Sequence, residues 1–200
     1  ALDSIRVDFE AGSSTALVGP NGAGKTTLLE VLAGLRQPST GSLTGAQPSV
    51  AFVTQTHSRS WLPLSVGEVL RMARFRPMLL PRRLGPDDHA AVDDAAGRLG
   101  VRDLVDAPLD RLSFGQRQRV LVAQALARQA DVMLLDEPIT GLDLVSQERI
   151  LGVMEAERDA GRIVVLSTHH LDEARHCDRV LVLGGRPVAA GSPAEVLVPS

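Results

Sequence analysis

The sequence has few side chains of several kinds, and each shortage narrows what the protein can be. Its 200 residues include one cysteine, no tyrosine and, among 21 basic residues, a single lysine. One cysteine cannot form an internal disulfide, which suits a reducing compartment. No apolar run reaches the length of a membrane-spanning helix, and no signal-peptide layout opens the chain. The formal net charge of −3 argues against a protein that coats nucleic acid.

The single lysine, Lys25, lies in residues 19–26, which read Gly-Pro-Asn-Gly-Ala-Gly-Lys-Thr and match the phosphate-binding loop pattern. Such a loop needs a compact ammonium group beside the phosphates, where a planar guanidinium would not fit. Residues 14–18 predict a buried strand and residues 25–35 a helix, so phosphates would lie at a helix N-terminus, which favours anions. A glycine-rich turn with a chance match is the alternative. The strand–loop–helix context favours a nucleoside triphosphate site.

Short apolar runs recur along the chain, separated by helical patterns, which is typical of a mostly parallel α/β core. These runs are residues 50–53, 132–135, 163–166 and 180–183. Residues 56–129 show helical periodicity instead, over 66–75, 87–99 and 115–129. We therefore expect one domain, 1–200, with a core formed by 1–55 and 130–200 and a helical lobe formed by 56–129.

Two carboxylates, Asp136 and Glu137, end the most apolar strand. Beside a phosphate loop, one carboxylate can hold Mg²⁺ while its neighbour orients the attacking water. Asp-Glu pairs are also common on ordinary protein surfaces. The flanking segments therefore decide whether this pair is interpreted as a catalytic site or as a surface feature. Those segments are residues 112–119, Leu-Ser-Phe-Gly-Gln-Arg-Gln-Arg, and residues 138–143, Pro-Ile-Thr-Gly-Leu-Asp.

With these motifs, in this order and spacing, nearly the whole chain resembles the ATP-binding cassette (ABC) ATPases of ABC transporters. The resemblance implies an α/β fold: a P-loop NTPase core with a mostly parallel sheet, an N-terminal antiparallel β portion and an inserted α-helical lobe. It implies hydrolysis of ATP with Mg²⁺ by a homodimer that encloses two ATP molecules. It also implies an integral membrane permease and an extracytoplasmic substrate-binding protein as partners, at the cytoplasmic face of the membrane.

The resemblance also assigns roles to residues of this chain. The catalytic residues it implies are Glu137, His169, Gln55 and Lys25. The residues it places at the nucleotide are Gly19, Pro20, Asn21, Gly22, Ala23, Gly24, Lys25, Thr26, Thr27, Ser113, Gly115, Gln116 and Asp143. The residues it places at the metal are Thr26, Gln55 and Asp136. A histidine at a strand end is often only a polar cap, so the role of His169 depends on the other motifs, and His170 is the second candidate.

Two features depart from the family. Phe114 stands where the signature segment usually has its first glycine, and its ring either packs against a partner or is a tolerated variant. The family stacks adenine on an aromatic residue upstream of the phosphate loop, whereas residues 1–18 contain only Phe9, which we expect in a strand too near the loop. The adenine-stacking segment is therefore expected to be absent from this sequence.

The transported substrate is the least determined property. Residues 63–66, 122–128 and 176–180 look similar to importers of manganese, zinc or chelated iron. Trp61, beside apolar residues, suits a docking patch for a membrane subunit or a local core anchor. Import of another substrate, and a nucleotide-sensing module with weak turnover, are the alternatives.

Overall fold

A computed structural model describes residues 5–45, 48–54, 63–75 and 83–197. The chain divides into two compact units. The sheet unit comprises Ala1–Gln55, Ala130–Thr140 and Met154–Ser200. The helical unit comprises Thr56–Gln129 and Gly141–Val153. None of the helices among the described residues has the apolar length that a bilayer crossing requires.

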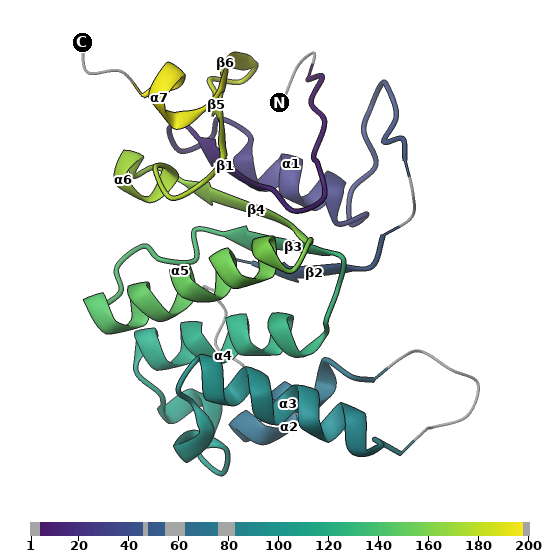
Figure 1. Cartoon of the computed structure of the whole chain (residues 1–200), viewed down its shortest axis with the longest axis vertical. Coiled ribbons are helices and arrows are strands. Elements are labelled where there is room, and N and C mark those ends of the chain that lie inside the picture. The colour runs from purple at the N-terminus through teal and green to yellow at the C-terminus, as the bar shows by residue number, and fades with distance from the viewer. Residues whose placement is uncertain (1–4, 46–47, 55–62, 76–82, 198–200) are drawn as a thin grey trace. The chain divides into compact units, whose positions relative to one another are not determined.

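The sheet unit contains a six-stranded sheet in the order β2-β3-β4-β1-β5-β6 (Figure 1). The first five strands run parallel, and β6 pairs antiparallel with β5. The strands are β1 (Ser14–Val18), β2 (Val50–Val53), β3 (Val132–Asp136), β4 (Ile163–Thr168), β5 (Arg179–Leu183) and β6 (Pro187–Gly191). The helices that follow strands in this unit are α1 (Lys25–Leu32), α6 (Leu171–Ala174) and α7 (Pro193–Val196).

The central strands contain continuous apolar runs because these strands are buried on both faces. Every residue of β1 and of β3 is buried. Leu28 and Leu29 of α1 join a core cluster with Leu17, Leu134 and Val165 from three neighbouring strands. This burial explains why the sequence shows continuous apolar runs rather than alternating ones.

Two serine–aspartate pairs hold the amino ends of neighbouring parallel strands. Ser49 donates its backbone N–H and its hydroxyl to one oxygen of Asp131, each at 2.8 Å, and the Asp131 N–H returns a bond to the hydroxyl at 3.0 Å. Ser14 and Asp178 repeat the same three bonds between β1 and the start of β5. With the registers held in this way, Val18 lies opposite Thr168, and Asp136 opposite Ser167. The carboxyl ends of β1, β3 and β4 therefore share one edge of the sheet.

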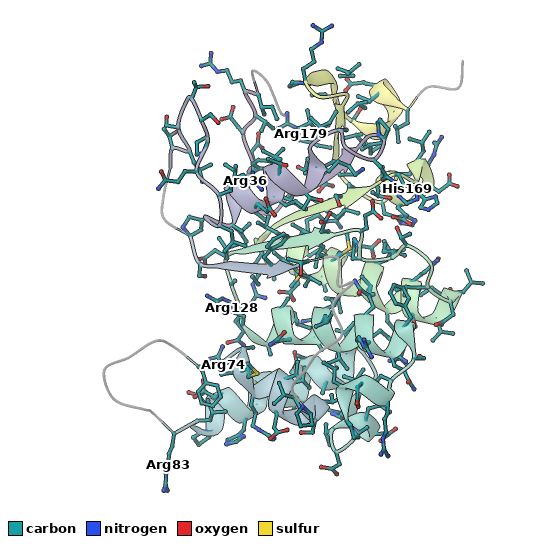
Figure 2. All side chains as sticks on the ribbon, turned by 180° about the vertical axis from the view of Figure 1, so that it is seen from behind. Arg36, Arg74, Arg83, Arg128, His169 and Arg179 are labelled. Atoms are coloured by element: carbon teal, nitrogen blue, oxygen red, sulfur yellow. The ribbon has the colours of Figure 1, made fainter. Side chains whose placement is uncertain are left out.

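The helical unit is built from short helices around an internal charged pair. Its elements are α2 (Val66–Met72), α3 (Pro86–Arg98), η1 (Arg102–Leu104), η2 (Leu109–Arg111), α4 (Phe114–Ala127) and the first turns of α5 (Leu144–Asp159). Arg74 donates from Nε to Asp88 at 2.9 Å and from Nη1 to the carbonyl oxygen of Ala127 at 3.1 Å (Figure 2). Asp88 also accepts the N–H of Gly85 at 2.9 Å, so one buried carboxylate links α3 with the segment after α2.

The α/β fold class with a mostly parallel sheet is confirmed, with three differences of detail. The antiparallel pairing occurs between β5 and β6, whereas residues 5–13, including Phe9, form no strand. Phe9 packs instead against the apolar core. Residues 141–153, expected with the core, group with the helical unit. The first helix ends at Leu32 rather than at residue 35, because Gly34 adopts a positive φ of 71°.

Candidate nucleotide-hydrolysis site

The loop between β1 and α1 is held against the end of β5. A Cβ atom on Gly19 would collide with the carbonyl oxygen of Leu183, so only glycine fits there. Gly24 precedes α1 with a φ of 97°, a left-handed conformation that glycine adopts at little cost. The loop thus ends at the N-terminus of a helix whose first N–H groups can bind phosphate oxygens.

The ammonium group of Lys25 points back into this loop. Its side chain is buried, and Nζ donates to the carbonyl oxygens of Gly19 at 2.7 Å and Pro20 at 3.2 Å. The same nitrogen lies 4.0 Å from Oε1 of Glu137. The positive charge is therefore held between the loop and the end of β3.

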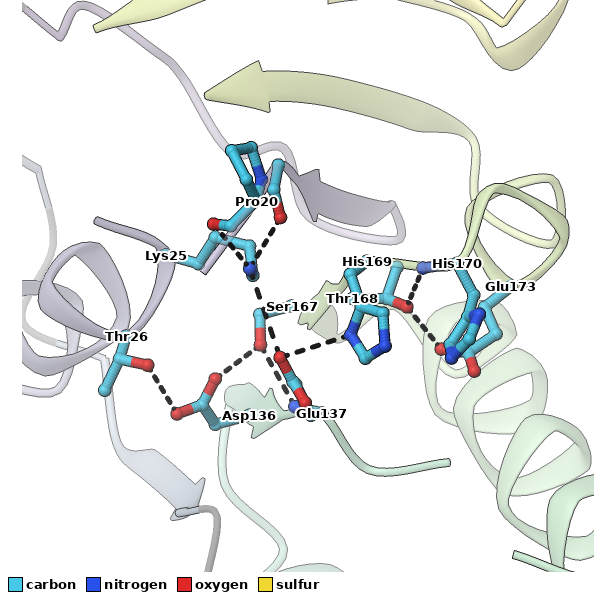
Figure 3. Close-up of polar contacts among 11 residues, drawn as sticks. Pro20, Lys25, Thr26, Asp136, Glu137, Ser167, Thr168, His169, His170 and Glu173 are labelled. Carbon is cyan, nitrogen blue, oxygen red and sulfur yellow. Dashed lines mark hydrogen bonds and ion pairs between the residues drawn. The ribbon is translucent and has the colours of Figure 1, made fainter. Parts of the chain in front are cut away.

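The end of β3 presents a carboxylate already bonded to two hydroxyl groups. Thr26 Oγ1 donates to Asp136 Oδ2 at 2.8 Å, and Ser167 Oγ donates to Asp136 Oδ1 (Figure 3). Asp136 is almost fully buried. Its position is thus determined by α1 on one side and β4 on the other.

Glu137 has an unusual backbone conformation for a residue with a side chain, with a φ of 48°. Left-handed conformations of this kind cost about 1–3 kcal/mol and persist where neighbours hold them. Here the Glu137 N–H donates to Ser167, to Oγ at 3.0 Å and to the carbonyl oxygen at 3.2 Å. The turn directs the carboxylate toward Lys25 and toward His169, whose Nδ1 lies 3.4 Å from Oε1.

A divalent cation fits beside Thr26 and Asp136. Mg²⁺ in nucleotide sites takes one or two protein oxygens, completing its shell with phosphate oxygens and water. The pairing of one hydroxyl with one carboxylate at 2.8 Å matches this requirement. Among the described residues no group of three or more His, Cys, Asp or Glu side chains forms a metal cage. Gln55, the third metal residue expected from the sequence, lies outside the described residues.

Comparison with known proteins decides the family. The family model described as ABC transporter matches residues 2–140. The chain belongs to the ABC transporter family. It is 36% identical to the chelated iron transport system membrane protein YfeB of Yersinia pestis, over 96% of this chain and 68% of that protein. It is 32% identical to the manganese transport system ATP-binding protein MntB of Halalkalibacterium halodurans, over 100% of this chain and 83% of that protein.

A solved structure agrees with this placement of the chain. The structure of cbiO1 from Clostridium perfringens, part of the ABC transporter complex cbiONQ, superposes with a TM-score of 0.82. The two chains are 31% identical, and the match covers 98% of this chain and 84% of the other. Together with the family model, these relatives identify the chain as an ATP-binding ATPase of the ABC type.

The helical unit of this ABC ATPase contains residues 112–116, which the sequence predicts to be the signature segment of the family. Ser113 caps α4: it accepts the N–H of Gln116 at 3.2 Å, and the Gln116 side chain accepts the Ser113 N–H at 2.9 Å. Asp143 accepts two bonds from Ser146, which lower the pKa of its carboxyl group. A Cβ atom on Gly115 would lie 3.0 Å from Asp143 Oδ2. Ser113, Gly115, Gln116 and Asp143 therefore gather at the starts of α4 and α5.

Phe114 lies at the first position of α4, and 59% of it is exposed. The remaining loop residues expected from the sequence, Asn21, Gly22, Ala23 and Thr27, lie in the loop or in the first turn of α1. Trp61 lies outside the described residues.

Ser167 was not singled out from the sequence, although its hydroxyl bonds both Asp136 and the Glu137 N–H. Its signal was weak: it lies near the end of an apolar strand, two residues before His169. A serine in that place reads equally well as a strand-end polar residue, and only the pairing of β3 with β4 reveals its two partners.

Proposed function

We propose that this ABC ATPase powers import across a membrane, with two copies enclosing two ATP molecules and Glu137 activating the attacking water. One observation carries the proposal: Lys25, Glu137 and His169 lie in a continuous line of contacts at the carboxyl ends of β1, β3 and β4. A cation that binds phosphate, a carboxylate that can orient water and a polar ring that can contact the γ-phosphate together suit hydrolysis of ATP.

Each of these residues has a distinct role in the proposed reaction. The N–H groups at the start of α1 and the Lys25 ammonium bind the β- and γ-phosphates. The Glu137 carboxylate orients a water molecule in line with the γ-phosphate and accepts its proton. The His169 imidazole binds the γ-phosphate and keeps it beside Glu137. ATP must first draw Lys25 away from the carbonyl oxygens of Gly19 and Pro20.

Thr26, Asp136 and Gln55 are proposed to hold Mg²⁺. A Mg²⁺ ion held there would supply positive charge that offsets the charge developing on the phosphate oxygens. Ser167 keeps Asp136 oriented through its hydroxyl, so the ligand geometry is set before ATP arrives.

The exposed start of α4 supports the proposed dimer. Helix starts favour anions, and Ser113 and Gly115 leave this one accessible apart from the Phe114 ring. In the proposed dimer it meets the γ-phosphate held by the other copy, together with Asp143.

Light scattering of the Glu137→Gln chain with and without Mg·ATP tests this arrangement. A dimer that forms only with Mg·ATP is expected, because the variant binds ATP but cannot hydrolyse it. A strict monomer in both conditions, even beside a membrane partner, would contradict the dimer. Wild-type turnover no higher than that of the Glu137→Gln chain would favour a nucleotide-sensing module instead.

The relatives suggest the proposed cargo, a metal ion such as manganese or zinc, free or chelated. Transport of manganese and of chelated iron is named for relatives that match nearly all of this chain. A hemin import protein of Streptomyces coelicolor, 39% identical over 98% of this chain, keeps import of another substrate as the second candidate. We propose an integral permease and an extracytoplasmic binding protein as partners, with this subunit at the cytoplasmic face.

Uptake of manganese, zinc, iron and hemin in a strain lacking the gene tests the cargo. Loss of manganese or zinc uptake, restored by the wild-type gene and not by the Glu137→Gln gene, is expected. Unchanged uptake of manganese, zinc and iron would contradict the proposal that the cargo is a metal ion. Loss of hemin uptake alone would favour the second candidate, import of another substrate.

A further inference from the structure

Two neighbouring histidines stack at the end of β4. The ring centroids of His169 and His170 lie 4.1 Å apart, and the rings are tilted by 39°. Consecutive side chains of an extended strand point to opposite sides, so this contact requires the chain to bend. The bend occurs at His169, directly after Thr168.

The backbone around His170 is held in place by a short hydrogen-bonded bridge. The His170 N–H donates to Thr168 Oγ1 at 2.9 Å, and that hydroxyl donates to Glu173 Oε2 at 2.5 Å. Thr168 is fully buried at the end of β4, and Glu173 belongs to α6. The bridge therefore joins the strand to the helix and leaves the His170 backbone little freedom.

The His170 ring makes one aromatic contact among the described residues, the stack on His169. Its polar hydrogen bond is made by the backbone rather than by the imidazole. The His169 ring also contacts the carboxylate of Glu137: its Nδ1 lies 3.4 Å from Glu137 Oε1 (Figure 3). His169 is thus held by a carboxylate through its nitrogen and by a second ring through stacking.

Without the stack, the long polar contact with Glu137 would be the interaction that orients the His169 ring. A nitrogen–oxygen separation of 3.4 Å is long for a hydrogen bond, and 39% of the His169 side chain is exposed to solvent. A partly exposed imidazole with a single long contact can rotate among several side-chain conformers. A second ring fixed by its own backbone reduces that freedom.

We propose that His170 is a positioning residue for ATP hydrolysis: its ring stacks on His169 and holds the imidazole toward Glu137. This inference rests on the proposed role of His169 at the γ-phosphate. The ring shape of His170 matters, and its nitrogens do not. His170 acts through His169 and makes no contact with the nucleotide.

Two substitutions separate ring shape from imidazole chemistry. His170→Ala removes the stack, and His170→Phe keeps a planar ring without nitrogens. We expect His170→Ala to lower kcat about two- to tenfold, the size of a typical aromatic pair, with KM for ATP unchanged. His170→Phe should restore kcat to near the wild-type value. His176→Ala, an exposed histidine of the same unit, serves as the matched control and should leave kcat unchanged.

A measurement independent of turnover uses NMR of the histidine-labelled chain. The sequence contains five histidines, so the ring signals can be assigned one by one. The ring signals of His169 should shift in His170→Ala, because a neighbouring ring current is lost, and should remain shifted from free histidine in His170→Phe. The signals of the other histidines should stay in place.

Turnover and NMR together separate the positioning role of His170 from the proposed role of His169 at the γ-phosphate. If His170→Phe loses as much turnover as His170→Ala, or if the His169 signals do not move in His170→Ala, the positioning role is wrong. If His169→Ala keeps full turnover, the role of His169 at the γ-phosphate is wrong, whereas the NMR result still tests the stack. In the His169→Ala background, His170→Ala should cause no further loss, because the two residues act as one unit.

Discussion

The sheet unit and the helical unit present their motif residues in opposite ways. In the sheet unit, residues from three separate segments contact one another: Lys25, Glu137, Ser167 and His169 all belong to one network. In the helical unit, Ser113 and Phe114 are exposed at the start of α4, and Ser113 exchanges hydrogen bonds with Gln116, three residues further along. The first arrangement joins segments that are distant in sequence, whereas the second presents a helix start at the surface.

The difference follows from how each unit is built. Parallel strands bring their carboxyl ends to one edge, so loops distant in sequence must meet there. A helix start needs only its own first turn, and a serine with a glutamine three residues later satisfies it locally. The residues proposed for the chemistry therefore lie in the sheet unit, and the surface proposed to meet the nucleotide of a second copy lies in the helical unit.

The largest expected effect on stability lies in the helical unit. Asp88→Ala should destabilise it by about 3–5 kcal/mol, because the guanidinium of Arg74 loses its buried partner. Urea unfolding should show the loss, and hydrogen exchange should place it in α2, α3 and α4 rather than in β3 and β4. Asp93 lies on the same helix as Asp88, α3, and forms an exposed pair with Arg102 of η1. Asp93→Asn, which removes the charge of this pair, is the matched control and should cost less than about 1 kcal/mol. Equal protection loss in both units would contradict the division into two units.

The largest expected effect on turnover lies in the sheet unit. Lys25→Arg should lower kcat by about 100- to 1000-fold, because the guanidinium cannot fit between the carbonyl oxygens of Gly19 and Pro20. Steady-state ATPase assays measure the loss. Arg36→Lys, an exchange of the same kind at an exposed surface pair, should leave kcat unchanged. Normal turnover in Lys25→Arg would refute the role given to the lysine.

A smaller effect concerns the pH dependence of stability. Burial raises the pKa of the Cys177 thiol, in the sheet unit, to about 12 from an ordinary value of 9.0. The unfolded chain therefore loses this proton first. The stability that depends on it is complete below pH 9 and is lost as the pH rises from about 9 to 12, by about 1 kcal/mol per pH unit.

Urea midpoints between pH 8 and 10 measure this slope, which is easier to read because the chain has no tyrosine. Cys177→Ala should flatten it, and the folded thiol should resist maleimide at pH 8. Rapid labelling of the folded chain would contradict the burial.

The smallest expected effect distinguishes a cap from a ligand-binding residue. Ser113→Ala and Ser65→Ala each remove a capping box from a helix of the helical unit, and each should cost about 1 kcal/mol. Only Ser113→Ala should weaken the Mg·ATP-dependent dimer of the Glu137→Gln chain, as measured by light scattering. If the two substitutions affect the dimer equally, Ser113 is a cap alone.

Much of this fold could be predicted from local patterns. The apolar runs matched β2 and most of β3, β4 and β5, because strands covered on both faces must be apolar throughout. The C-terminal strand β6 was not predicted: Pro187–Gly191 is short, mostly exposed and lies at the sheet edge, so it has no such pattern. The antiparallel pairing was expected at the wrong end for the same reason.

Residue types and spacing predicted the phosphate loop, because it requires glycines and a lysine at neighbouring positions. The roles of the carboxylate pair and of the histidines after β4 were implied by the resemblance to the family, which depends on all the motifs together. What only the tertiary structure decided is how they meet. The registers of β1, β3 and β4 bring Lys25, Glu137 and His169 to one edge, and Ser167 holds Glu137 in its left-handed conformation. The stack of His170 on His169 is another contact that only the tertiary structure reveals. Such contacts join segments through space or through a bend, and a one-dimensional pattern carries no distance between side chains.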